Sequence, residues 1–114
     1  VLDNVRQTGA VLGEILEDLK EKYPIVGDVR YIGLFSAIEL VKDRETKEPL
    51  VPYGKDPEGK MGQIIGMLEE RGFMTYSHEN MILIAPPLII TEEQLREEMA
   101  KMDEVLNIAD QTMR

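Results

Sequence analysis

Few side chains in this 114-residue sequence are equipped for chemistry. The sequence has one histidine, His78, and no cysteine, which excludes disulfides, thiolate nucleophiles and clustered Cys/His metal sites. A lysine could bind a carbonyl cofactor covalently if apolar surroundings lowered its pKa. All the lysines, however, stand on polar helix faces or in charged segments: Lys20, Lys22, Lys42, Lys47, Lys55, Lys60 and Lys101. We therefore predict no catalytic residue and no metal site in this chain.

The carboxylates and glycines do not form a site either. Three adjacent pairs lie on helix faces that we expect to be exposed: Glu69–Glu70, Glu92–Glu93 and Glu97–Glu98. Neighbours on a helix point about 100° apart, so such a pair does not easily share a proton. No glycine-rich phosphate loop follows a strand. We therefore predict no cofactor-binding residue in this chain.

Tyr76 and His78 are the two side chains left as candidates for contact with a substrate. Tyr76 ends a predicted strand, and its ring either packs at a domain surface with a wet hydroxyl or faces a pocket. His78 lies in the predicted turn that follows. It is either an exposed turn residue or a general acid or base. The residues alone leave both pairs of alternatives open.

The charge of the chain limits its partners. There are 22 acidic residues against 13 Lys and Arg, a net charge of −9. The electrostatic field of so acidic a chain repels nucleic acid, and the sequence has no cluster of basic residues that would bind an anionic membrane surface. No apolar run approaches the roughly 20 residues of a membrane span, and the first ten residues do not resemble a secretory signal. We therefore expect neither nucleic acid nor a membrane as a partner, and a cytoplasmic location, with which the lack of cysteine agrees.

The first half of the chain predicts a long helix followed by two strands. Apolar residues recur every three or four positions over 2–22, which is typical of an amphipathic helix that ends before Pro24. Two apolar strands over 25–42 meet at Gly33, where we expect a kink or bulge. Residues 43–60 are rich in charge, proline and glycine, and we predict a mobile loop there.

The second half predicts helix, strand, strand and helix. Asp56 and Pro57 suit the start of a helix that Gly72 closes. Strands are expected over 73–76 and 81–85, with a turn between them, and a capping box at Thr91 opens the final helix. This order predicts one α+β domain, a small, mainly antiparallel sheet with helices packed on one face.

Two separated stretches of the sequence closely resemble class III aminotransferases. One runs from Pro24 to Asp43 and contains Ile32-Gly33-Leu34-Phe35; the other runs from Asn80 to Thr91 around Ala85-Pro86-Pro87. They occur in the expected order and spacing, and the flanking helices fit as well. The resemblance thus covers essentially the whole chain and is greatest to the ω-amino acid:pyruvate type.

The resemblance implies that residues 1–114 are the C-terminal small domain of a fold-type-I enzyme that uses pyridoxal phosphate (PLP). In that family the Schiff-base lysine and most phosphate contacts belong to a large domain, which this chain lacks. The intact parent would move an amino group from an ω-amino acid or amine to a keto acid such as pyruvate, and would be a homodimer. Its small domain would contact its own large domain and form one wall of the substrate pocket. The isolated chain would be inactive and bind no PLP.

The same resemblance assigns Tyr76 and His78 to the wall of the substrate pocket. Relatives commonly carry an arginine that grips a substrate carboxylate, and its position falls on Tyr76 or, in another subgroup, near Leu83. Neither residue is arginine here. The wall is therefore expected to bind a carboxylate differently.

A second reading of the sequence is a free-standing α+β module with a regulatory or protein-interaction role. The two readings differ in one testable feature. A domain of a larger enzyme should expose an apolar patch where its large domain packs, whereas an independent module should not.

Overall fold

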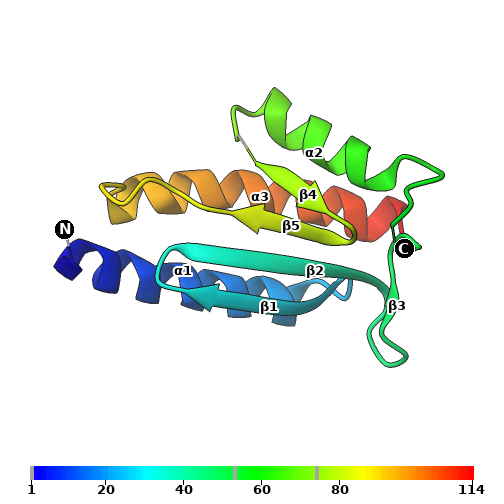
Figure 1. Ribbon diagram of the computed structural model, residues 1–114, viewed down its shortest axis with the longest axis horizontal. Coiled ribbons are helices and arrows are strands. Elements are labelled where there is room, and N and C mark those ends of the chain that lie inside the picture. The colour runs from blue at the N-terminus through cyan, green and yellow to red at the C-terminus, as the bar shows by residue number, and fades with distance from the viewer. Residues whose placement is uncertain (1, 53, 74) are drawn as a thin grey trace.

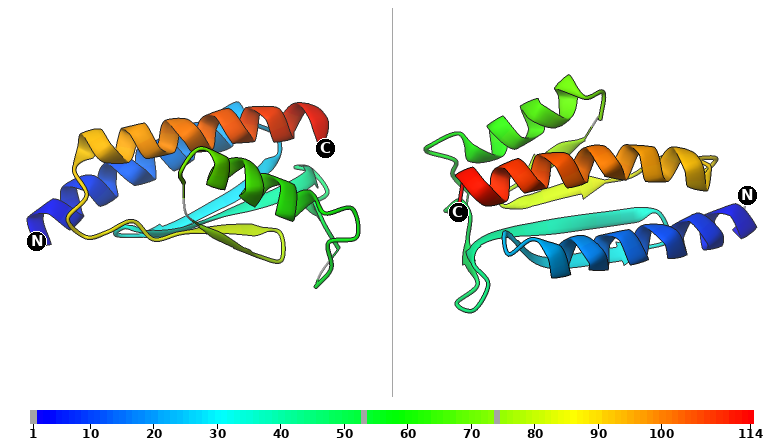
Figure 2. Two further views of the ribbon diagram at one scale, coloured as in Figure 1. Left: turned by 90° about the horizontal axis from the view of Figure 1, so that it is seen from above. Right: turned by 180° about the vertical axis from the view of Figure 1, so that it is seen from behind.

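The computed structural model describes residues 2–52, 54–73 and 75–114. Three helices, α1 (Leu2–Lys22), α2 (Lys60–Glu70) and α3 (Glu92–Thr112), cover one face of a sheet (Figures 1 and 2). The sheet has the strand order β1-β2-β5-β4, with the short β3 paired to β2, and all its pairings are antiparallel. This confirms the predicted α+β class.

The helix layer has α3 at its centre, between α1 and α2 (Figure 2). The amphipathic stripe of α1 is confirmed, because Leu12, Leu16 and Leu19 are all buried. The capping box of α3 is also present: the Thr91 side chain accepts from the Gln94 backbone, and the Gln94 side chain accepts from the Thr91 backbone. Burial of these stripes against the sheet supplies the main driving force for the fold.

Strands β1 (Val26–Ile32) and β2 (Phe35–Asp43) form a hairpin whose two-residue turn is Gly33–Leu34. The expectation of a kink or bulge at Gly33 was wrong. Gly33 has φ 57°, a left-handed value that glycine adopts without steric cost, so the chain reverses there. The irregularity in register lies instead at Val26/Asp28.

Helix α1 packs directly on this hairpin turn. A Cβ atom built on Gly9 would lie only 2.9 Å from the carbonyl oxygen of Gly33, so the two backbones touch. Only glycine allows this approach without a shift of backbone. The contact fixes the hairpin turn relative to the N-terminal half of α1.

The 43–60 segment is anchored at its beginning. Strand β3 (Glu48–Pro49) pairs with β2, and Leu50 and Val51 enter the core. The Arg44 guanidinium donates hydrogen bonds to carbonyls of Lys20, Tyr23 and Val26 at the end of α1. Mobility of the segment stays a prediction, and its residue Tyr53 lies outside the described residues.

Two element boundaries differ from expectation. Helix α2 begins at Lys60 rather than near Pro57, because Gly59 has φ 68° and interrupts the backbone there. Asp56 still satisfies the first turn from outside the helix, since its carboxylate accepts from the backbone N–H groups of Met61 and Gly62 at 3.4 and 3.2 Å. Gly72, φ 78°, follows the helix as predicted.

In the second hairpin the returning strand begins at Met81 as predicted, but the strand before it lies later in the chain than expected and the turn is shorter. Strand β4 spans Tyr76–His78 and β5 spans Met81–Ile84, with the turn at Glu79–Asn80. Asn80 holds that turn by donating from Nδ2 to the Leu40 carbonyl at 2.8 Å. The predicted strand 73–76 included Met74, which lies outside the described residues.

Asp103 joins the end of α1 to α3 and makes the domain sensitive to acid. It accepts hydrogen bonds from the Tyr23 hydroxyl and from Lys22 Nζ at 2.9 Å. Partial burial acts to raise the pKa of Asp103, but the hydrogen bonds from Tyr23 and Lys22 outweigh it, so the pKa lies below its ordinary value of 3.8. Stabilisation by this carboxylate is therefore present above about pH 4 and is lost as the pH falls through the folded-state pKa.

We expect Asp103→Asn to lower the free energy of unfolding by about 1 kcal/mol at pH 7, since the pair is partly exposed and screened. The difference from wild type should shrink as the pH falls below about 4, as measured by urea unfolding between pH 3 and 7. Glu97→Gln, at an exposed position of α3, is the control. If the difference in free energy of unfolding between wild type and Asp103→Asn stayed constant down to pH 3, the stabilising role of the Asp103 carboxylate would be contradicted.

Candidate functional site

The face of the sheet that carries no helices is the candidate functional surface, and we call it the open face. Side chains alternate between the two faces of a strand. The paired row Val29, Ile38 and Ile82 points toward the helices and is buried. The neighbouring row therefore points away from the helices. Across β1, β2, β5 and β4 it consists of the paired residues Arg30, Ala37, Leu83 and Tyr76.

The open face has an apolar half and a charged half. Near the Gly33–Leu34 turn it presents Ile32 and Phe35, which are 86% and 56% exposed. Toward the other end of the strands it presents Arg30, which forms ion pairs with Asp28 and Glu39. An apolar half left open to water is the feature that we expected of a domain that packs against more protein.

Tyr76 and His78 both project from this face, because they are two positions apart on β4. Tyr76 pairs with Leu83 and is 61% exposed. His78 pairs with Met81, and its Nε2 lies 3.8 Å from Glu79 Oε1. The structure thus brings the two candidates onto one surface and corrects the position of His78, which belongs to the strand rather than the turn. Contact with a substrate stays a prediction for both.

The open face offers no unengaged arginine among the described strand residues. Arg30 is the arginine that points to this side. Its guanidinium lies 3.2 Å from Glu39 Oε2 and 3.8 Å from Asp28 Oδ2. A cation already neutralised by two carboxylates is poorly placed to grip a third. The exposed hydroxyl of Tyr76 is, by contrast, a neutral hydrogen-bond donor on this face.

The sequence reasoning missed the exposed apolar residues at one end of the molecule. Besides Ile32 and Phe35, these are Leu88 and Ile89, which are 57% and 79% exposed. The signal was available in part, since Leu88 and Ile89 follow two prolines that end β5. What the sequence did not reveal is that both pairs lie at the end where α1 begins (Figure 1).

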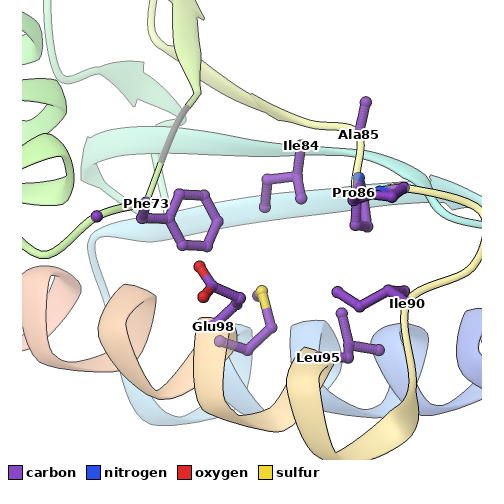
Figure 3. A pocket seen from close by; sticks show the side chains of 10 residues that line it. Phe73, Ile84, Ala85, Pro86, Ile90, Leu95 and Glu98 are labelled. Atoms are coloured by element: carbon purple, nitrogen blue, oxygen red, sulfur yellow. The ribbon is translucent and has the colours of Figure 1, made fainter.

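An apolar pocket of about 370 Å³ opens on the other side of the sheet, between the end of β5 and α3. Phe73, Ile84, Ile90 and Leu95 point into it (Figure 3). Its one acidic side chain, Glu98, is paired with Lys101 at 2.9 Å. Because a single paired carboxylate lacks a second acid or base, the pocket has shape but no evident catalytic chemistry.

The lysines lie outside the core. None of them is buried. The least exposed is Lys60, whose side chain is 17% exposed and whose Nζ lies 3.5 Å from Glu58 Oε2. Even the least exposed lysine is thus in contact with solvent and with a carboxylate, and none of the seven lies in the apolar core. Among the described residues, no group of three potential metal ligands occurs, and no helix has the length and apolar character to cross a membrane.

A comparison with models of protein families identifies the family of this chain. The model of the family described as "Aminotransferase class-III" matches residues 1–106. This chain belongs to the class III aminotransferase family. The resemblance noted in the sequence is thereby confirmed, and the helix-covered sheet is that family's fold over this region.

Individual relatives support the same conclusion. The chain is 36% identical to taurine–pyruvate aminotransferase of Bilophila wadsworthia, with 97% of this chain aligned to 25% of that protein. It is 33% identical to ethanolamine-phosphate phospho-lyase homolog 1 of Caenorhabditis elegans, with 95% of this chain aligned to 22% of it.

A solved structure of a third class III relative agrees closely in fold. The crystal structure of taurine:2-oxoglutarate aminotransferase from Bifidobacterium kashiwanohense, in complex with PLP and glutamate, superimposes with a TM-score of 0.93 at 43% identity. The match covers 98% of this chain and 25% of that one. The chain therefore spans about a quarter of the length of these relatives.

Proposed function

We propose that the chain is the C-terminal small domain of a PLP-dependent transaminase that moves an amino group from an ω-amino acid or amine to a keto acid such as pyruvate. The observation that carries this proposal is the class III match over residues 1–106, in a chain that spans a quarter of its relatives. The covalent lysine and the phosphate contacts would then lie in the remaining part of the polypeptide. PLP, when bound there, supplies the electron sink for transfer of the amino group.

In this proposal the open face forms one wall of the substrate pocket. Tyr76 lines the wall and His78 lies at its rim. The partners of the domain are its own large domain, a second subunit of a homodimer, and the amine and keto acid substrates. Support comes from the exposed apolar half of the face, since large exposed hydrophobic groups mark surfaces that pack against protein or ligand.

The wall would contact an acidic substrate group through a neutral donor. A phenol donates a single hydrogen bond, which contributes about 0.5–1.5 kcal/mol, whereas a hydrogen bond to a charged group contributes about 1.5–3 kcal/mol. An arginine can also bind a carboxylate through two parallel hydrogen bonds. With Tyr76 in that position, the wall should discriminate only modestly between carboxylate-bearing amines and plain amines.

We expect two Tyr76 variants of the full-length enzyme to separate these roles. Tyr76→Phe should lower kcat/KM for β-alanine by no more than about tenfold, since about 1.4 kcal/mol corresponds to tenfold. Tyr76→Arg should raise the ratio of kcat/KM for β-alanine to that for an aliphatic monoamine, because a bidentate pair becomes possible. Steady-state kinetics with pyruvate as acceptor provide the measurement.

The matched control is Tyr31→Phe. It also removes one tyrosine hydroxyl, but from the helix side of the sheet, where that hydroxyl donates to Glu17 at 2.8 Å. It should leave the ratio between the two substrates unchanged. If neither Tyr76 variant moves that ratio, Tyr76 serves only in packing and the proposed wall is misplaced.

A further inference from the structure

The turn that follows Pro86 and Pro87 is held in place from a distant part of the chain. Asn4, near the start of α1, donates both amide hydrogens of its side chain to this turn, at 2.9 Å to the Leu88 carbonyl and 3.0 Å to the Ile90 carbonyl. Within the turn, the Ile90 N–H donates to the Pro87 carbonyl at 3.0 Å. One side chain thus fixes a turn more than 80 residues away in sequence.

This ordered turn nevertheless leaves its apolar side chains in water. Two prolines restrict the backbone before it, and the hydrogen bonds restrict it further. Leu88 and Ile89 remain 57% and 79% exposed. Exposed apolar side chains cost free energy that burial against another surface would recover. A rigid backbone lowers the entropy that such a contact must overcome.

The β1–β2 hairpin turn lies at the same end of the molecule and is also fixed by α1 (Figures 1 and 2). Gly9 touches the Gly33 carbonyl, as described above. The hairpin turn is flanked by Ile32 and Phe35, and the next residue, Ser36, pairs with Ile84 of β5, the strand that leads into the second turn. We call the four exposed residues Ile32, Phe35, Leu88 and Ile89 the apolar end.

The outward surfaces of the helices differ from the apolar end in charge. Exposed carboxylates stand along α1 and α3, among them Glu14, Glu21 and Glu97. Burying such charges would cost far more than burying the apolar end, whose four side chains carry none. A packing partner is therefore best accommodated at the apolar end.

We propose that the apolar end packs against the PLP-binding part of the longer polypeptide, and that Asn4 is a positioning residue that fixes the Leu88–Ile89 turn for this contact. The inference rests on the proposed function. The chosen occupant follows from length: the chain spans about a quarter of its relatives, so three quarters of such a polypeptide lies outside these residues.

The first test releases the turn in the full-length protein. Asn4→Asp keeps the shape of the side chain but replaces two donors with acceptors that face two carbonyls. Hydrogen exchange at the Ile90 amide should accelerate by roughly tenfold or more. Asn107→Asp is the matched control, since Asn107 accepts from Gln111 through an oxygen that aspartate retains. Equal exchange rates in the two variants would overturn the role of Asn4.

The second test removes the apolar contact. The double variant Leu88→Asp/Ile89→Asp should accelerate hydrogen exchange in at least one segment outside residues 1–114 by about tenfold, whereas Gln63→Asp, at an exposed position of α2, should not. Unchanged exchange throughout that region would overturn the contact. A change in oligomeric mass by sedimentation would overturn it too, because it would assign the apolar end to a second copy. Transamination by the wild-type protein checks the proposed function separately.

Discussion

Replacing Arg44 with methionine should lower the free energy of unfolding of residues 1–114 by about 3 kcal/mol, the largest stability loss that we expect from a single polar side chain. The guanidinium donates to carbonyls of Lys20, Tyr23 and Val26, where α1 ends and the chain turns into β1. The Lys20 carbonyl lies in the last turn of α1, where carbonyls lack partners within the helix. Methionine fills a similar space but donates nothing, so three carbonyls lose a charged donor.

Urea unfolding at pH 7 provides the measurement, and Arg96→Met provides the control. Arg96 is exposed and pairs only with Glu92, one turn before it on α3, at 3.0 Å. An exposed pair of this kind contributes about 0.3–0.5 kcal/mol. If the two variants lost equal stability, the Arg44 contacts would be surface contacts of little energetic weight. Arg44→Lys should fall between the two, because an ammonium keeps the charge and three donors but carries them on a more flexible stem than the Nη2 group that makes these contacts.

Pyridoxal phosphate added in equimolar amount to residues 1–114 should give no stable, stoichiometric visible band, whereas the full-length protein should give one. Every lysine of the chain is at least partly solvated, and even Lys60 faces Glu58. A lysine that binds an aldehyde cofactor stably needs apolar surroundings, and none of these lysines lies in the core. Absorption spectra recorded during a titration at pH 7.5 provide the measurement.

Weak, random reaction of surface amines is the background in this experiment. It should be shared among the lysines and removed by gel filtration. Lys60→Ala, the variant at the least exposed lysine, should therefore be indistinguishable from wild type. A band that survives filtration at one equivalent and disappears with one lysine substitution would show that this chain contains its own cofactor site.

The helices were the part of the fold that the sequence determined best. Apolar spacing in α1, the Thr91–Gln94 capping box and the left-handed Gly72 are local features, in which residues within about four positions satisfy one another. These local features depend little on how the rest of the chain is packed. The family resemblance was equally visible, because it depends on the order of residues and not on their contacts.

The boundaries set by turns and strand pairing were less predictable. Gly33 marks a chain reversal, but sequence alone did not separate a reversal from a kink, since glycine permits both. The start of α2 moved to Lys60 because Gly59 adopts a left-handed conformation, and Asp56 then caps the helix from outside it. His78 joined β4 because Met81 pairs with it. In each case the backbone conformation of one residue or the register of a strand pair decided the outcome, and residue types alone did not specify either.

The sequence by itself determined the fold class, which followed from the periodicity of its segments, and the family, which two motifs in the right order indicated. Only the tertiary structure decided which side of the sheet is open. That choice depends on pairing β2 with β5, more than 40 residues later, and on all three helices covering one face. The same packing brings Tyr76 and His78 onto the open face and places Asn4 beneath the Leu88–Ile89 turn. Such contacts between distant segments leave no periodic signal in the chain, because each depends on the register of the whole sheet.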